Sequence, residues 1–140
     1  DEVQAVHWFR KGAEAGDGQA MTRLGWAYEH GRGGLQKDEA QGLAWHRRGA
    51  ATGNVTAMSN LGVVLFKGIA GLPADSTAAE PWLRRAASLG GEQAMGFLAH
   101  LYETGTGGLD ENLDLAVDWY RKAAAKGDEY SKRALARLQR

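Results

Sequence analysis

Apolar residues recur along this chain with the three-to-four-residue period of an α-helix. Ala20, Leu24 and Tyr28 are spaced i, i+4 and i+8, which places their side chains on one face of a helix. Residues 61–66, taken alone, read as a buried strand because they include β-branched valines. The segments 37 residues before and after them have no such bias, so we predict a helix there too.

The whole pattern repeats every 37 residues. Tryptophans mark this period at Trp8, Trp45, Trp82 and Trp119, and a basic pair follows each of them. Other residues keep the same step, among them Leu24, Leu61, Leu98 and Leu135 and Gly16, Gly53, Gly90 and Gly127. Such repeats are typical of solenoids, in which each unit buries its apolar face against the next. We therefore divide a single repeat domain, residues 1–140, into a half unit 1–16, repeats 17–53, 54–90 and 91–127, and a half unit 128–140.

Each repeat predicts two helices, which we term A and B. A helices are expected at about 18–30, 55–67, 92–104 and 128–139, and B helices at about 2–15, 38–52, 75–89 and 112–126. Glycine after each B helix supplies the positive φ that ends a helix, and Asp38, Asp75 and Asn112 are expected N-caps. Pro81 lies inside one B helix, where a proline loses a hydrogen bond and clashes. That helix is therefore predicted to start late or to kink near residues 79–81.

The repeat resembles that of the Sel1-like repeat family, which is related to the tetratricopeptide repeat. The first full repeat carries the pattern at Ala20, Leu24, Gly25, Tyr28, Gly31, Gly33, Asp38, Ala40, Trp45, Gly49, Ala50, Ala51 and Gly53. Leu65 in place of tyrosine, Ala99 in place of glycine, and Pro81 depart from it. The resemblance implies an all-α, right-handed α/α superhelix that binds proteins, mostly as an adaptor, with bacterial members in signalling, secretion, envelope assembly and toxin neutralisation. The disulfides of the cysteine-rich branch do not apply, because this chain has no cysteine.

Composition narrows the partner classes. The 17 basic and 17 acidic residues give a net charge of zero, which argues against a nucleic-acid partner. The longest apolar run is far shorter than the roughly 20 residues that span a bilayer, so no membrane insertion is expected. No targeting segment is visible, and we expect a soluble protein of the bacterial periplasm or cytoplasm without choosing between them.

Residues that could carry catalysis do not converge in the sequence. The four histidines show no metal-ligand spacing, and only His100 and Glu103 share a helix face. His30 would lie two helix layers away from them, on the order of 20 Å. We therefore expect no catalytic residue, no metal and no cofactor, and we predict that the protein is not an enzyme.

The periodic tryptophans are predicted to pack in the core or between repeats. The basic pairs that follow them are expected to form a solvated convex edge, with a surface for an acidic partner or a phosphate backbone as the alternative. Trp26 is different, because it lies off the 37-residue period and its equivalents are Val63, His100 and Arg137. The scaffold does not require a large apolar side chain there.

In tetratricopeptide-like solenoids the A helices line a concave groove. With Leu24 and Tyr28 in the core, the groove side should carry a mixed, unrepeated set of residues. The partner-binding candidates are Thr22, Trp26, Glu29, His30, Ser59, Val63, Phe66, Lys67, His100, Glu103, Arg133 and Arg137, with Gln19, Thr56, Gln93, Thr104 and Tyr130 on the same face. Trp26 and Phe66 are the expected apolar anchors, and Arg133 and Arg137 the polar ends.

We therefore expect a scaffold or adaptor that binds a partner protein or peptide in this groove. The alternative is a dedicated, immunity-type inhibitor of one cognate secreted toxin or enzyme.

Overall fold

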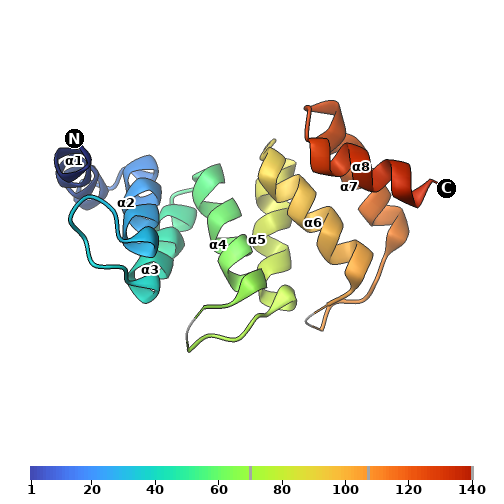
Figure 1. Cartoon of the computed structure of the whole chain (residues 1–140), viewed down its shortest axis with the longest axis horizontal. Helices are drawn as coiled ribbons and strands as arrows, with labels where there is room; N and C mark the ends of the chain where they lie inside the picture. The colour runs from blue at the N-terminus through green and yellow to red at the C-terminus, as the bar shows by residue number, and fades with distance from the viewer. Residues whose placement is uncertain (70, 107, 140) are drawn as a thin grey trace.

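The chain folds as a row of antiparallel helix pairs, with its two ends far apart (Figure 1). The computed structural model describes residues 1–69, 71–106 and 108–139. Within them lie eight helices: α1 (Glu2–Glu14), α2 (Gly18–His30), α3 (Glu39–Ala51), α4 (Val55–Lys67), α5 (Ser76–Ser88), α6 (Glu92–Thr104), α7 (Leu113–Ala125) and α8 (Glu129–Leu138). The only β-structure in the described residues is an isolated bridge between Ile69 and Leu72. The predicted all-α solenoid is confirmed.

Local sequence sets the helix ends as predicted, to within about one residue. Asp38, Asp75 and Asn112 each accept a hydrogen bond from the backbone N–H three residues on, and so cap α3, α5 and α7. The glycines that follow the B helices have φ between 90° and 101°, a conformation that other residues adopt at a cost. They are Gly16, Gly53, Gly90 and Gly127. Residues 61–66 are helical within α4, as the repeat predicts.

The prediction that the helix containing Pro81 starts late is wrong. The helix α5 begins at Ser76, and Asp75 caps it by accepting from the N–H of Ala78. Ala79 and Leu83 are fully buried on its inner face, so packing holds the first turn in helical form despite the missing proline donor. The Pro81 side chain is exposed.

The core runs the length of the solenoid in two clusters, one over α1 to α3 and a larger one over α3 to α8. Trp45, Trp82 and Trp119 pack against these clusters and are partly buried, as predicted. Trp8 is 64% exposed, so the prediction that it packs in the core or between repeats is wrong for this residue. It lies on α1, the first helix of the described chain.

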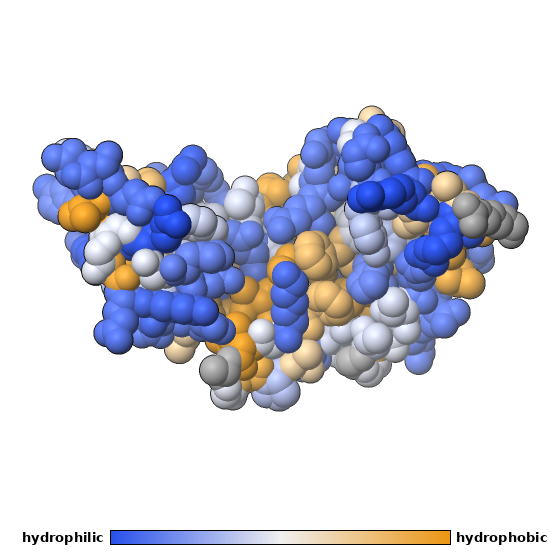
Figure 2. Space-filling view, in the orientation of Figure 1, coloured by the Kyte–Doolittle hydropathy of each residue, from blue (hydrophilic) through white to orange (hydrophobic). Residues whose placement is uncertain are grey.

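The A helices lie on the inner side of the curve. The helix α2 contacts α4, and α4 contacts α6, whereas no comparable contact joins α3 to α5 or α5 to α7 in the described residues. B helices that are spread apart and A helices that approach each other produce a surface hollowed on the A side. The space-filling view shows an outline hollowed between the two ends, with apolar surface gathered toward the middle (Figure 2).

Candidate partner-binding groove

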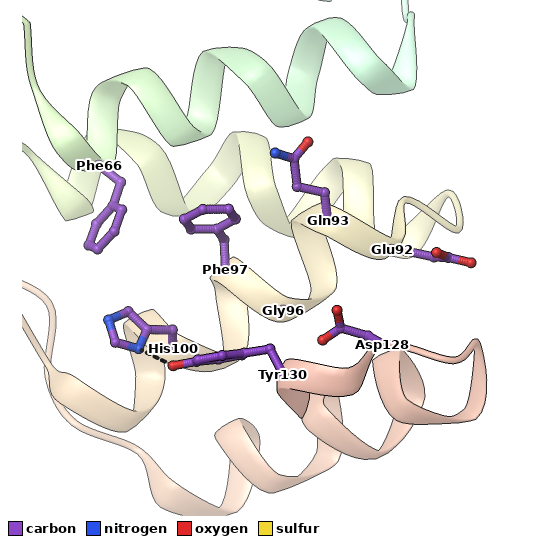
Figure 3. A pocket seen from close by; sticks show the side chains of 8 residues that line it. All are labelled: Phe66, Glu92, Gln93, Gly96, Phe97, His100, Asp128 and Tyr130. Atoms are coloured by element: carbon purple, nitrogen blue, oxygen red, sulfur yellow. Dashed lines mark hydrogen bonds between the residues drawn. The ribbon is translucent and has the colours of Figure 1, made fainter. Parts of the chain in front are cut away.

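Two depressions lie along the A helices. The N-terminal depression has a volume of about 550 Å³ and is lined by α1, α2, α4 and the loop after α2. The C-terminal depression has a volume of about 330 Å³ and lies between α4, α6 and the start of α8 (Figure 3). Both touch α4, and together they are the candidate site, which we term the groove.

Aromatic rings and guanidinium groups dominate the N-terminal depression. The Trp26 side chain is 47% exposed, and its ring stacks on His30 with centroids 4.6 Å apart. The Arg32 guanidinium lies 5.9 Å from the centre of the Trp26 ring and forms an ion pair with Glu2. The hydrogen bond from Arg32 lowers the pKa of Glu2. Arg23 lies 5.8 Å from the centre of the Phe9 ring.

The C-terminal depression has an aromatic end and an acidic end. Phe66 and Phe97 meet edge to face with centroids 6.0 Å apart, and Phe66 contacts His100 in the same way at 5.8 Å. The Tyr130 hydroxyl lies 3.2 Å from Nδ1 of His100 (Figure 3). Figure 3 shows the carboxylates of Glu92 and Asp128 at the other end of the depression, away from Phe66.

The structure corrects one of the groove predictions. Ser59 is only 3% exposed and lies beside Gly91, so it joins successive repeats and is not available to a partner. Thr22 holds the same position one repeat earlier and is 4% exposed, but it still borders the N-terminal depression. Its hydroxyl donates to the carbonyl of Gly18 and lies 3.2 Å from Oδ1 of Asn54.

The neighbouring position in each A helix also lines the groove. Arg23, Asn60 and Phe97 are equivalent residues in successive A helices, and each borders one of the two depressions. Sequence reasoning missed them. The sequence feature that could have identified them is their variety. One position of the repeat holds a cation, an amide and an aromatic ring in turn, while the core leucine that follows it is the same in each repeat.

Glu29 and Glu103 are held by the B helices. Oε2 of Glu29 lies 3.2 Å from Nε2 of His46, whose side chain is fully buried, and this hydrogen bond lowers the pKa of Glu29. The Tyr120 hydroxyl donates to Oε2 of Glu103 at 2.6 Å, and Arg137 forms an ion pair with the same carboxylate. Burial raises the pKa of Glu103, but these two contacts outweigh it and leave that pKa lowered.

The remaining candidates, except His100, border neither depression. Val63 is partly buried against the core, and Arg133 is exposed on α8. Lys67 Nζ lies 5.8 Å from the centre of the Phe97 ring. His100 lines the C-terminal depression, whereas His30 stacks on Trp26.

The described residues offer no assembled metal site. Within residues 1–69, 71–106 and 108–139, no three His, Asp or Glu side chains are grouped closely enough to hold a metal ion. None of the helices in the described chain is both long and apolar enough to cross a membrane.

Solved structures similar to this chain are themselves repeat solenoids. One is c5321, a protective antigen present in uropathogenic Escherichia coli strains that displays an SLR fold, with 30% identity and a TM-score of 0.93 over 99% of this chain. Another is a Sel1 repeat protein from Oxalobacter formigenes, with 30% identity and a TM-score of 0.88 over 98% of this chain. The chain spans only 29% and 55% of the lengths of these two proteins.

The immunity protein Pa5087 from Pseudomonas aeruginosa is similar in fold alone, with 24% identity and a TM-score of 0.60 over 90% of this chain and 46% of its own. A comparison with curated proteins finds no match. The Sel1 repeat family model matches four successive segments, residues 1–17, 18–54, 55–91 and 92–128. The chain therefore belongs to the Sel1 repeat family, a right-handed α/α superhelix that is generally non-catalytic and mediates protein–protein interaction.

Proposed function

We propose that this chain is a protein-interaction module that binds a segment of one partner protein along the groove of α2, α4, α6 and α8. One observation carries the proposal: the positions that line the groove differ in every repeat, while the core positions recur. The recurring leucines Leu24, Leu61 and Leu98 are fully buried. The residues that line the groove are Arg23 and Trp26, then Asn60 and Phe66, then Phe97 and His100. Folding of the repeat does not require these positions to differ.

The groove also has the physical character of a binding surface. Aromatic and arginine side chains carry a large share of the binding energy in protein interfaces, and both types line the N-terminal depression. Covering the half-exposed ring of Trp26 stabilises a complex by about 1–2 kcal/mol on the usual scale for apolar burial. The two depressions are large enough to receive several side chains of a partner.

An inhibitor of one toxin or enzyme is the second form that such binding could take. The likeness to the immunity protein supports only that this fold can carry that role, since it extends to the fold alone. The two forms differ in what binding does to the partner. An inhibitor abolishes the partner's activity in a stoichiometric complex, and an adaptor leaves it intact.

The test is affinity capture from the source cell, followed by measurement of the dissociation constant for the captured partner. We expect Trp26→Ala with Phe66→Ala to weaken binding by about 2 kcal/mol or more, roughly 30-fold, with the helical circular dichroism signal retained. The matched control is Trp8→Ala, because Trp8 is even more exposed but borders neither depression. Unchanged affinity in the double variant would move the site to the basic pairs of the B helices, where Arg47 and Arg84 would be changed next.

A further inference from the structure

The two ends of the groove carry opposite charge, although the chain as a whole has none. The N-terminal depression is lined by Arg23 and Arg32 against one carboxylate, that of Glu2. The C-terminal depression is lined by Glu92 and Asp128, with no arginine or lysine among the residues that border it in the described chain. Positive and negative groups are therefore separated along the groove in a chain whose net charge is zero.

We infer that the groove recognises a bipolar segment of its partner, with an acidic side chain in the N-terminal depression and a basic side chain in the C-terminal depression. The inference rests on the proposed function and adds to it the chemistry of the partner. A basic side chain in the N-terminal depression, or an acidic one in the C-terminal depression, would be repelled by the charges already there. The same separation therefore excludes a segment with the opposite order of charges.

Arg23 is the group that would receive the acidic side chain. Its side chain is exposed on α2, and no ion pair holds it among the described residues, whereas Arg32 is already paired with Glu2. The Phe9 ring, 5.8 Å from the guanidinium carbon, supports one side of the group. A guanidinium held in this way can form paired hydrogen bonds to a carboxylate.

The C-terminal depression combines the two features that bind a cation. The first is the aromatic surface of Phe66, Phe97 and Tyr130, and the chain itself shows that this surface accepts a cation, because Lys67 lies over the Phe97 ring. The second is the carboxylate of Glu92, which is exposed on the first turn of α6 and forms no ion pair in the described part of the chain. A lysine or arginine of a partner can therefore lay its stem on the rings and direct its charge to Glu92.

The spacing of the two charges follows from the helices that carry them. Arg23 lies on α2 and Glu92 on α6, and α4 lies between these helices. Packed helices lie roughly 10 Å apart, so two steps separate the charges by on the order of 20 Å. An extended segment covers that distance in about six residues, at roughly 3.3 Å each. The acidic and basic side chains of the partner should be separated by that number.

The experiment selects phage-displayed random dodecapeptides on the immobilised full chain. We expect the enriched peptides to carry Asp or Glu about six residues from Lys or Arg. The consensus peptide is then synthesised with a fluorescent label, and its affinity is measured by polarisation. Glu92→Lys and Arg23→Glu should each weaken binding at least tenfold, and each should be rescued by a peptide in which only the corresponding charge is reversed.

Matched controls carry the same charge changes away from the groove. Asp118→Lys on α7 and Arg47→Glu on α3 alter exposed side chains of B helices, and both should stay within twofold of the original chain. Enriched peptides without the charge pair, no enriched peptide at all, or affinity that survives both reversals would overturn the inference. The proposed function fails separately, when the captured partner binds the Trp26→Ala, Phe66→Ala variant as tightly as the original chain.

Discussion

The contact between Glu29 and His46 gives the sharpest test of how the repeats are held together. His46 is fully buried in α3, and its Nε2 lies 3.2 Å from Oε2 of Glu29 in α2. Its Nδ1 has no hydrogen-bond partner among the described residues. One repeat further on, the same two positions hold Phe66 and Leu83, so the fold does not require a polar pair there.

We predict that removing Glu29 costs more than removing His46. Glu29→Ala leaves both nitrogens of a buried imidazole without a partner, and an unsatisfied buried group costs about 1–3 kcal/mol. We therefore expect a loss of about 2 kcal/mol in the free energy of unfolding. His46→Leu removes both nitrogens and leaves a carboxylate whose side chain is 31% exposed and can turn to water. The expected cost is below about 1 kcal/mol, and the double variant should cost no more than His46→Leu alone.

Urea unfolding followed by far-ultraviolet circular dichroism measures these differences as shifts in midpoint at constant slope. Glu14→Ala, which removes an exposed carboxylate of α1, is the control. The hydrogen bond from His46 lowers the pKa of Glu29 below its ordinary value of 4.5. The contribution of ionised Glu29 to the free energy of unfolding is therefore complete above pH 4.5 and is lost as the pH falls through the pKa of Glu29 in the folded protein. The destabilisation caused by Glu29→Ala should accordingly shrink in acid. A Glu29→Ala variant no less stable than His46→Leu would refute this account.

Three further predictions concern packing, backbone and titration. Gly62→Ala should lower the free energy of unfolding in urea by about 1–2 kcal/mol, because the new Cβ would lie 2.5 Å from Cγ of the buried Leu83. The gain in helix propensity offsets only part of that overpacking. Pro81→Ala should raise the free energy of unfolding by about 1–3 kcal/mol, because it restores an N–H donor inside α5 at an exposed site, and an unchanged urea midpoint would contradict this. Burial and the hydrogen bond to Glu80 raise the pKa of Tyr102 to about 12. The contribution of this contact to the free energy of unfolding should therefore be complete below pH 10 and lost as the pH rises through 12. Tyrosinate absorbance and urea unfolding follow the two changes, and ionisation of Tyr102 at pH 10 would contradict the prediction.

The helices could be predicted from sequence because the signals that set their ends are local. An aspartate or asparagine cap at one end and a glycine with positive φ at the other define each B helix without reference to the rest of the fold. The prediction failed at Pro81 because its outcome depends on distant residues. The cap at Asp75 and the burial of Leu83 hold α5 in helical form from its first turn, and a local rule does not include that packing.

The groove could be predicted only to within one helical position. The periodicity of a single helix identifies a face about 100° wide, but the crossing of successive A helices decides which edge of that face is covered. Ser59 is predicted on the open side and instead is buried beside Gly91 of the next repeat. Phe9 of α1 was missed because it reaches the N-terminal depression from a B helix, through a contact between units that no single repeat contains.

Differences among the three repeats therefore have two sources, and the structure separates them. Some residues that touch across a repeat change in pairs, because a new side chain on one helix must suit its contact on the other: Glu29 with His46, and Glu103 with Tyr120. Arg23, Asn60 and Phe97 line the groove and also change from repeat to repeat, although Arg23 lies against the ring of Phe9 and Phe97 against that of Phe66. Packing explains the paired changes, and we propose that contact with a partner accounts for the changes along the groove. On this proposal, the separation of charge along the groove is the feature that most restricts the chemistry of the partner.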